Sequence, residues 1–129
     1  MIDIKELTTI LARKRKLINV TPHKLNMVDP DGTEWVLPPD FTVSVNVKSD
    51  NLGTRNGVRL IKPRYDQAGS EDVREVLKIL VNAGFTVIGS QMTARTYKGL
   101  VVYGVPPAGH IRGSKKVIRS DVFSTEEEF

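Results

Sequence analysis

Apolar residues recur at helical spacing in a segment near the start of the chain. Ile4, Leu7, Ile10 and Leu11 fall on one face of a helix that we expect over residues 3–16. The segment ends in the run Arg13-Lys-Arg-Lys16. Cations suit a helix C-terminus, where the helix dipole is negative, so the run is read as a solvated helix end rather than as a targeting motif.

A second helical pattern is stronger and is predicted to form a central amphipathic helix. Its apolar positions are Val73, Val76, Leu77, Leu80 and Val81. Ser70 supplies a capping hydroxyl ahead of two first-turn acids, and Gly84 is a left-handed stop. A shorter helix is expected over residues 90–97, with Ser90 as its cap.

Alternation of apolar and polar residues predicts strands elsewhere. The clearest alternation is Phe41-Thr-Val-Ser-Val-Asn-Val47, which is typical of a strand with one buried face. Further strands are expected at residues 17–20, 24–28, 33–37, 58–62, 85–89, 100–103 and 117–119.

Turn residues separate these strands. Asp29-Pro-Asp-Gly32 predicts a tight turn, because proline presets φ and glycine accepts a positive φ. Pro38 and Pro39 remove two backbone donors and should end the strand before them. By composition, residues 49–57 and 108–116 read as loops.

The order of elements predicts an α+β fold. We expect a mainly antiparallel sheet, an N-terminal helix and the central amphipathic helix. Residues 1–120 are taken as a single domain, and residues 121–129 as an acidic C-terminal tail that is solvated and frayed. No apolar run is long enough to span a membrane, so the expected location is the cytoplasm.

Charge is uneven along the 129 residues, whose formal net charge is +4. Four of the 15 acidic residues lie in 121–129, which leaves 11 acidic against 19 basic groups, or +8, in residues 1–120. Such a surplus favours an anionic partner, although a basic but inert surface explains it equally well. The absence of cysteine excludes disulfides and thiolate chemistry.

Catalytic and metal-binding patterns are weak. A two-histidine phosphoesterase needs Ser or Thr two residues after each histidine, but Leu25 follows His23 and Arg112 follows His110. His23 is expected to fix a turn. Asp29 and Asp31 belong to the turn motif, and the further ligands of a calcium loop are missing. We therefore expect no metal, no cofactor and no enzymatic activity.

Basic and aromatic residues suggest anion binding instead. Candidates are grouped as Arg55 in a glycine-rich loop, Arg59, Arg64 and Tyr65 around one strand end, Arg95 and Tyr97 after Ser90-Gln91, and His110, Arg112, Lys115 and Lys116 after Pro106-Pro107. Guanidinium groups clamp phosphates and tyrosine rings stack on bases. No nucleophile with an adjacent base emerges, which fits binding without turnover.

A short signature near the N-terminus carries a family resemblance. It combines an Asn-x-Thr-Pro-His corner, an Asp-Gly hairpin and a Leu-Pro-Pro step, formed here by Asn19, Thr21, Pro22, His23, Asp31, Gly32, Leu37, Pro38 and Pro39. In these residues the chain resembles a family of small phage proteins, the Thoeris anti-defence sponges. The similarity covers residues 18–47 and, more loosely, 85–97. Asp40-Phe41 stands where the family has Ser-Gly, and Val43-Ser-Val45 replaces its Ala-Arg-Val.

The resemblance implies a homo-oligomer that traps a cyclic nucleotide immune signal in the host bacterial cytoplasm. The signal would be a cyclic ADP-ribose isomer or a cyclic oligonucleotide, held without cleavage. Expected ligand contacts are Arg95, Ser90 and Tyr97, with Arg55, Arg59 and Arg112 as phosphate clamps. The family motif residues Thr21, Pro22, His23, Gly32, Pro38 and Pro39 would be structural.

Other functions remain open from the sequence. The basic body also suits a nucleic-acid-binding phage accessory protein. A nucleotide phosphodiesterase would use His23 or His110 as acid or base. A virion or scaffold protein without a ligand contradicts no sequence feature.

Overall fold

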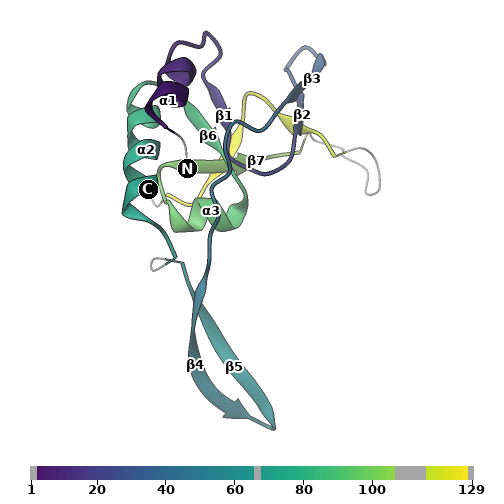
Figure 1. Ribbon diagram of the computed structural model, residues 1–129. Helices are drawn as coiled ribbons and strands as arrows, with labels where there is room; N and C mark the ends of the chain where they lie inside the picture. The colour runs from purple at the N-terminus through teal and green to yellow at the C-terminus, as the bar shows by residue number, and fades with distance from the viewer. Residues whose placement is uncertain (1–2, 66–67, 107–115, 128–129) are drawn as a thin grey trace.

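The computed structural model describes residues 3–65, 68–106 and 116–127 (Figure 1). Within these residues the elements are α1 (Ile4–Leu11), β1 (Leu17–Asn19), β2 (Leu25–Val28), β3 (Glu34–Leu37), β4 (Lys48–Arg55), β5 (Val58–Arg64), α2 (Glu71–Asn82), β6 (Thr86–Ile88), α3 (Gln91–Thr96), β7 (Val101–Gly104), β8 (Ile118–Arg119) and β9 (Phe123–Thr125). The expected α+β fold with an N-terminal and a central helix is confirmed.

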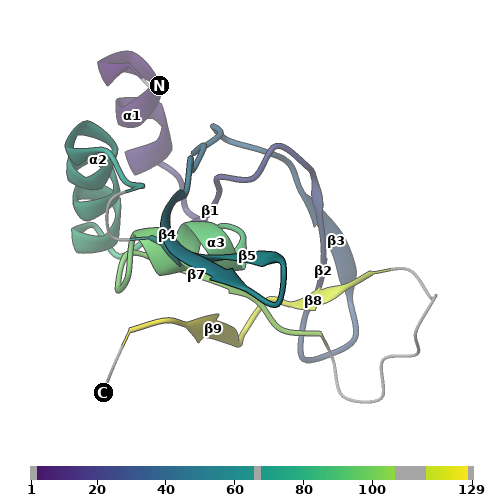
Figure 2. The ribbon, with the colours of Figure 1, turned by 90° about the horizontal axis from the view of Figure 1, so that it is seen from below.

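The expectation of a mainly antiparallel sheet was wrong, because the central sheet is mixed, in the order β1-β6-β7-β9. Strands β1, β6 and β7 run parallel, and β9 joins β7 antiparallel at the edge. Helix α3 is the crossover between β6 and β7. Helices α1 and α2 lie side by side against the body (Figures 1 and 2). Apolar side chains from all three helices and from the sheet share one core, and the most deeply buried of them include Ile18, Leu77, Leu80, Tyr97 and Val101.

A second sheet, in the order β3-β2-β8, packs a smaller core of Met27, Leu37, Ile88 and Ile118. The predicted turn between β2 and β3 is confirmed. Gly32 has φ +90°, and its N–H donates to the carbonyl of Asp29 at 2.9 Å. Leu37 ends β3 just before Pro38 and Pro39, as expected.

Strands β4 and β5 form a separate antiparallel ribbon, here called the arm, which projects away from the body (Figure 1). The prediction of a loop over residues 49–57 was wrong. Asn56 and Gly57 both adopt positive φ, at 52° and 80°, and close a tight hairpin between the strands. Backbone pairing with β5 therefore outweighs the weak strand preference of this glycine- and asparagine-containing segment.

The strand predicted at residues 41–47 is also wrong. This segment belongs to no strand of the described chain, although burial still alternates, with Val43 buried and Thr42 and Ser44 exposed. The Val43 N–H donates to the Val20 carbonyl at 3.0 Å. An extended segment can bury alternate side chains against a core without pairing with another strand along its length. The alternation of apolar and polar residues therefore indicates which side chains are buried, but not whether the segment belongs to a sheet.

Two predicted ends differ from the structure. Helix α1 stops at Leu11 rather than at residue 16. The cations that follow it contact other segments instead: Arg13 pairs with Asp40 at 2.6 Å, and Arg15 lies 3.8 Å from the Trp35 ring centroid. At the other end, the tail expected to fray contains β9, which pairs with β7.

The caps of the later helices follow the prediction with one exception. Gly84 has φ +90° just after Ala83, the C-cap of α2, and the Ser90 hydroxyl accepts the Thr93 N–H at 3.1 Å to cap α3. Ser70 occupies the N-cap of α2, but its hydroxyl makes no capping hydrogen bond.

Candidate functional site

A cavity of about 1030 Å³ lies where the base of the arm meets α3 and the C-terminal segment. Its basic lining residues are Lys62, Arg64, Arg74, Arg95 and Lys98, and its acidic ones are Asp50 and Glu126. Five cations against two anions make this a positively charged cavity. We call it the cationic cavity.

Arg95 lies in the last turn of α3 and contacts an acidic residue, Glu126, and an aromatic residue, Tyr65, of the cavity. Its Nε–H donates to Oε1 of Glu126 at 3.4 Å, and its guanidinium lies 5.5 Å from the centre of the Tyr65 ring. Tyr65 and Glu126 raise the pKa of Arg95 above its ordinary value. With 42% of its side chain exposed, Arg95 can still reach a ligand.

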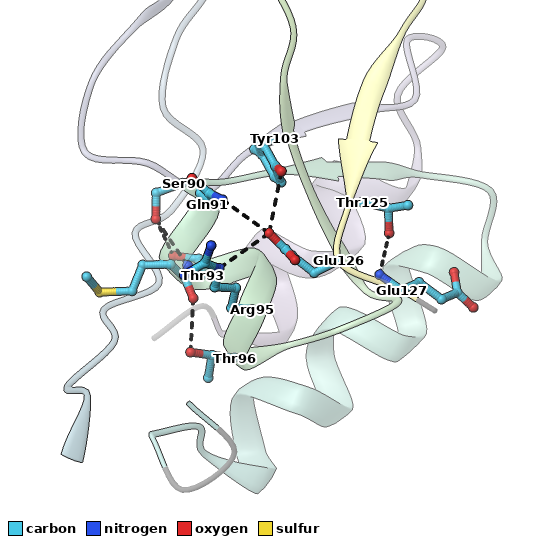
Figure 3. A network of polar contacts seen from close by, with 10 residues as sticks. Ser90, Gln91, Thr93, Arg95, Thr96, Tyr103, Thr125, Glu126 and Glu127 are labelled. Carbon is cyan, nitrogen blue, oxygen red and sulfur yellow. Dashed lines mark hydrogen bonds and ion pairs between the residues drawn. The ribbon is translucent and has the colours of Figure 1, made fainter. Parts of the chain in front are cut away.

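Glu126 is the centre of a polar network (Figure 3). Its Oε1 accepts from Gln91 Nε2 at 3.3 Å and from Tyr103 Oη at 3.4 Å, in addition to Arg95. The hydrogen bond from Gln91 and the contacts with Arg95 and Tyr103 lower the pKa of Glu126. Three donors therefore favour the ionised form of Glu126. The cavity already holds one negative charge at this position.

The remaining guanidinium groups of the cationic cavity have internal partners as well. Arg64 pairs with Asp50 at 3.3 Å, and Arg74 pairs with Glu71 at 3.5 Å while lying 5.1 Å from the Tyr97 ring centre. These contacts orient both guanidinium groups. A phosphate entering the cavity would therefore meet donors that are already positioned.

A second cavity, of about 620 Å³, is lined in part by Ser90 and Gln91 at the start of α3. The parallel strands β1 and β6 end beside it, and it is lined by Thr21, Pro22, His23, Ser90 and Tyr103, among others. Ligands of sheets with parallel strands commonly bind at the carboxyl ends of those strands. Residues of the two segments in which we expected the family resemblance, 18–47 and 85–97, both line this cavity.

Asn19 builds the Thr-Pro-His corner at that cavity. Its fully buried amide donates to the carbonyls of His23 at 2.8 Å and Leu37 at 3.1 Å, and its Oδ1 accepts the Thr21 N–H at 2.9 Å. His23 takes part through its backbone, while its side chain is exposed. We expected the ring of His23 to fix this turn, but the side chains of Asn19 and Thr21 fix it instead.

The structure divides the predicted ligand contacts. Arg95 lines the cationic cavity, together with Arg64 and Tyr65, whereas Ser90 lines the second cavity. Arg55 and Arg59 lie near the tip of the arm, and neither lines either cavity.

The prediction that Tyr97 contacts the ligand was wrong. Its side chain is 1% exposed, and its hydroxyl accepts the Ser70 N–H at 3.0 Å, so it supports the fold and presents no ring face to a base. Arg112 falls outside the described residues, as do His110 and Lys115.

Several residues of the site were missed by sequence reasoning. Lys62, Arg74, Lys98 and Glu126 line the cationic cavity, but none belongs to a motif. Arg74 and Glu126 come from a helix and from the presumed tail, and only the fold brings them together. Glu126 follows a strand too short to show any periodicity.

Comparison with protein-family models, with curated proteins and with solved structures found no match for this chain. Among the described residues, no group of three or more His, Cys, Asp or Glu side chains lies close enough together to hold a metal ion. In the same residues, no helix has the length and apolar character needed to cross a membrane.

Proposed function

We propose that this protein binds a cyclic nucleotide signal in the cationic cavity and retains it without cleaving it, as a phage anti-defence sponge would. The observation that carries the proposal is the convergence of Lys62, Arg64, Arg74, Arg95 and Lys98 on one cavity. A cyclic ADP-ribose isomer or a cyclic oligonucleotide has two or more phosphate charges to satisfy several such cations.

The dimensions and chemistry of the cavity support a nucleotide. Pockets for small ligands commonly have volumes of about 300–1000 Å³, and this one reaches about 1030 Å³. Arginine forks bind phosphate oxygens bidentately. Tyr65, beside Arg95, offers an aromatic ring on which a base can stack.

Glu126 supplies a physical reason for selective binding of anions. Its carboxylate already neutralises Arg95 at 3.4 Å. A ligand with two or more phosphate charges and several acceptor oxygens can replace that carboxylate, whereas a neutral ligand gains nothing by doing so. Ligand binding and release of Glu126 are therefore coupled.

A trap-and-release assay tests the proposal. The purified protein is incubated with a panel of cyclic ADP-ribose isomers, cyclic dinucleotides and cyclic trinucleotides. The filtrate and the heat-denatured protein fraction are then analysed by mass spectrometry. Depletion from the filtrate, followed by recovery of the same intact compound, is the expected result.

Two variants localise the binding. Arg95→Ala should lose retention, because it removes a partly exposed guanidinium that lines the cavity. Arg119→Ala is the matched control, since Arg119 is 41% exposed and pairs with Asp121 at 2.9 Å outside the cavity. Recovery of a converted product would show an enzyme instead. Absence of any depletion, or equal loss in both variants, would refute the proposed site.

A further inference from the structure

The arm is a two-stranded ribbon that no third strand joins within the described residues. Its register runs from the pair Lys48 and Arg64 at the body to the pair Arg55 and Val58 at the tip. At about 3.3 Å per residue, eight residues extend about 26 Å. Every residue of β4 is exposed, and the arm projects away from the body in Figure 1.

The arm is strongly basic. Its cations are Lys48, Arg55, Arg59, Lys62 and Arg64, and its single acid is Asp50. Directly paired residues of two strands share a face, so the register places four of these five cations, all except Arg59, on one face. Asp50 lies on the same face, opposite Lys62, and pairs with Arg64 at 3.3 Å, which leaves this face with a net charge of +3. We call this the positive face of the arm. Lys62 and Arg64 continue it into the cationic cavity at the base.

The apolar side chains of the arm argue against a second copy of the chain as its partner. Leu52, Val58 and Ile61 are 62%, 60% and 54% exposed. Val58 and Ile61 are three residues apart in β5, which puts them on opposite faces. No continuous apolar face results, although stable protein interfaces need one at their centre. A second copy would also bring a net charge of +4 toward a basic arm.

We propose that the arm binds double-stranded DNA, with the ribbon in the major groove and its positive face against the phosphates. The major groove of B-DNA is about 12 Å wide and admits a two-stranded ribbon. The major groove of duplex RNA is deep and narrow and excludes one. The arm therefore has the shape and the charge for DNA, a function that goes beyond ligand retention and shares Lys62 and Arg64 with the cationic cavity.

Fluorescence anisotropy of the full chain tests this inference. The probe is a fluorescein-labelled 24-base-pair DNA duplex, titrated at several NaCl concentrations between 50 and 200 mM. Four phosphate contacts predict a slope of about −3.6 for log K against log salt, which is a loss of affinity of about a hundredfold over this range. Lys48→Gln with Arg55→Gln should make the slope shallower by about 1.8 and weaken binding at 50 mM salt.

A matched control removes the same charge elsewhere. Lys5→Gln with Lys14→Gln alters exposed residues in and just after α1, at the opposite end of the molecule from the arm (Figure 1). This variant should keep the wild-type slope. Neither Lys48 nor Arg55 lines the cationic cavity, so trapping of a cyclic nucleotide should persist in the arm variant.

Four results would overturn the inference. The first is undetectable duplex binding at 50 mM salt, and the second is an equal change of slope in both double variants. The third is a sedimentation equilibrium dimer that the arm variant abolishes while duplex binding is unchanged. A duplex RNA of the same sequence should bind more weakly than the DNA, and tighter RNA binding would also contradict the major-groove geometry.

Discussion

The Nε atom of Arg95 lies 3.4 Å from Oε1 of Glu126, a carboxylate 31 residues further along the chain. This pair joins α3 to the segment that follows β9, and Gln91 and Tyr103 converge on the same oxygen (Figure 3). The cationic cavity thus contains an internal anion beside Arg95.

Replacing that anion should strengthen ligand binding. Glu126→Gln removes one negative charge from the cationic cavity but keeps an oxygen acceptor for Gln91 and Tyr103. We expect pyrophosphate to bind the variant several-fold more tightly than wild type, as measured by titration calorimetry at pH 7.5. Glu127→Gln is the control, since its exposed carboxylate does not line the cavity. Equal affinity of the two variants would show that Glu126 does not compete with the ligand.

Asp29 makes the β2–β3 hairpin sensitive to acid. The Ser120 hydroxyl and the Trp35 Nε1–H, the latter at 2.7 Å, both donate to Asp29 Oδ1 and hold its pKa below the ordinary value of 3.8. The ionised form is thus favoured in the folded state. Its contribution to stability is complete above pH 3.8 and is lost as the pH falls through the lower, folded-state pKa.

The single tryptophan reports this titration. We expect the emission of Trp35 to change with a midpoint below pH 3.8, while far-ultraviolet circular dichroism shows that the chain is still folded. Asp29→Asn should remove the transition. A midpoint above 3.8 in the wild type would contradict the assigned hydrogen bonds.

Asn19 should be costly to replace. Asn19→Ala leaves the carbonyls of His23 and Leu37 without their donor and the Thr21 N–H without its acceptor. We expect the free energy of unfolding to fall by about 2–3 kcal/mol, measured by urea denaturation. The exposed Asn46→Ala is the control and should change it by less than about 0.5 kcal/mol. A small effect at Asn19 would mean that water replaces these bonds.

The two tyrosines near Arg95 should respond differently. Tyr97→Phe removes only the acceptor of the Ser70 N–H and should cost about 1 kcal/mol of stability, with ligand retention unchanged. Tyr65→Ala should reduce retention of a cyclic nucleotide with little change in the melting temperature. The reverse outcome in the trap-and-release and melting assays would assign base stacking to Tyr97.

Local signals made parts of the fold predictable. The stop at Gly84 and the cap at Ser90 act within one helical turn, and the turn at Gly32 depends on one glycine, so short sequence patterns were sufficient. The arm carried such a signal as well, because Asn56-Gly57 is a dipeptide typical of hairpins. The surrounding polar composition concealed it.

Other features depend on contacts between distant segments. The parallel pairing of β1 with β6 joins Leu17 to Thr86. The cationic cavity likewise draws on the arm, α2, α3 and the C-terminal segment. Grouping by charge and aromaticity found Arg64, Tyr65 and Arg95, yet it also included Tyr97, because the sequence gives no measure of how deeply a tyrosine between helix and strand is buried.

The arm leaves and re-enters the body through a single residue pair, Lys48 with Arg64. Two chain ends held that close can be joined by a hairpin of almost any length. Each paired residue added toward the tip would extend the reach by about 3.3 Å without changing the path of the core. Insertions and deletions in relatives of this protein should therefore concentrate between Asn51 and Ile61, where the length of the ribbon can evolve independently of the cavity beneath it.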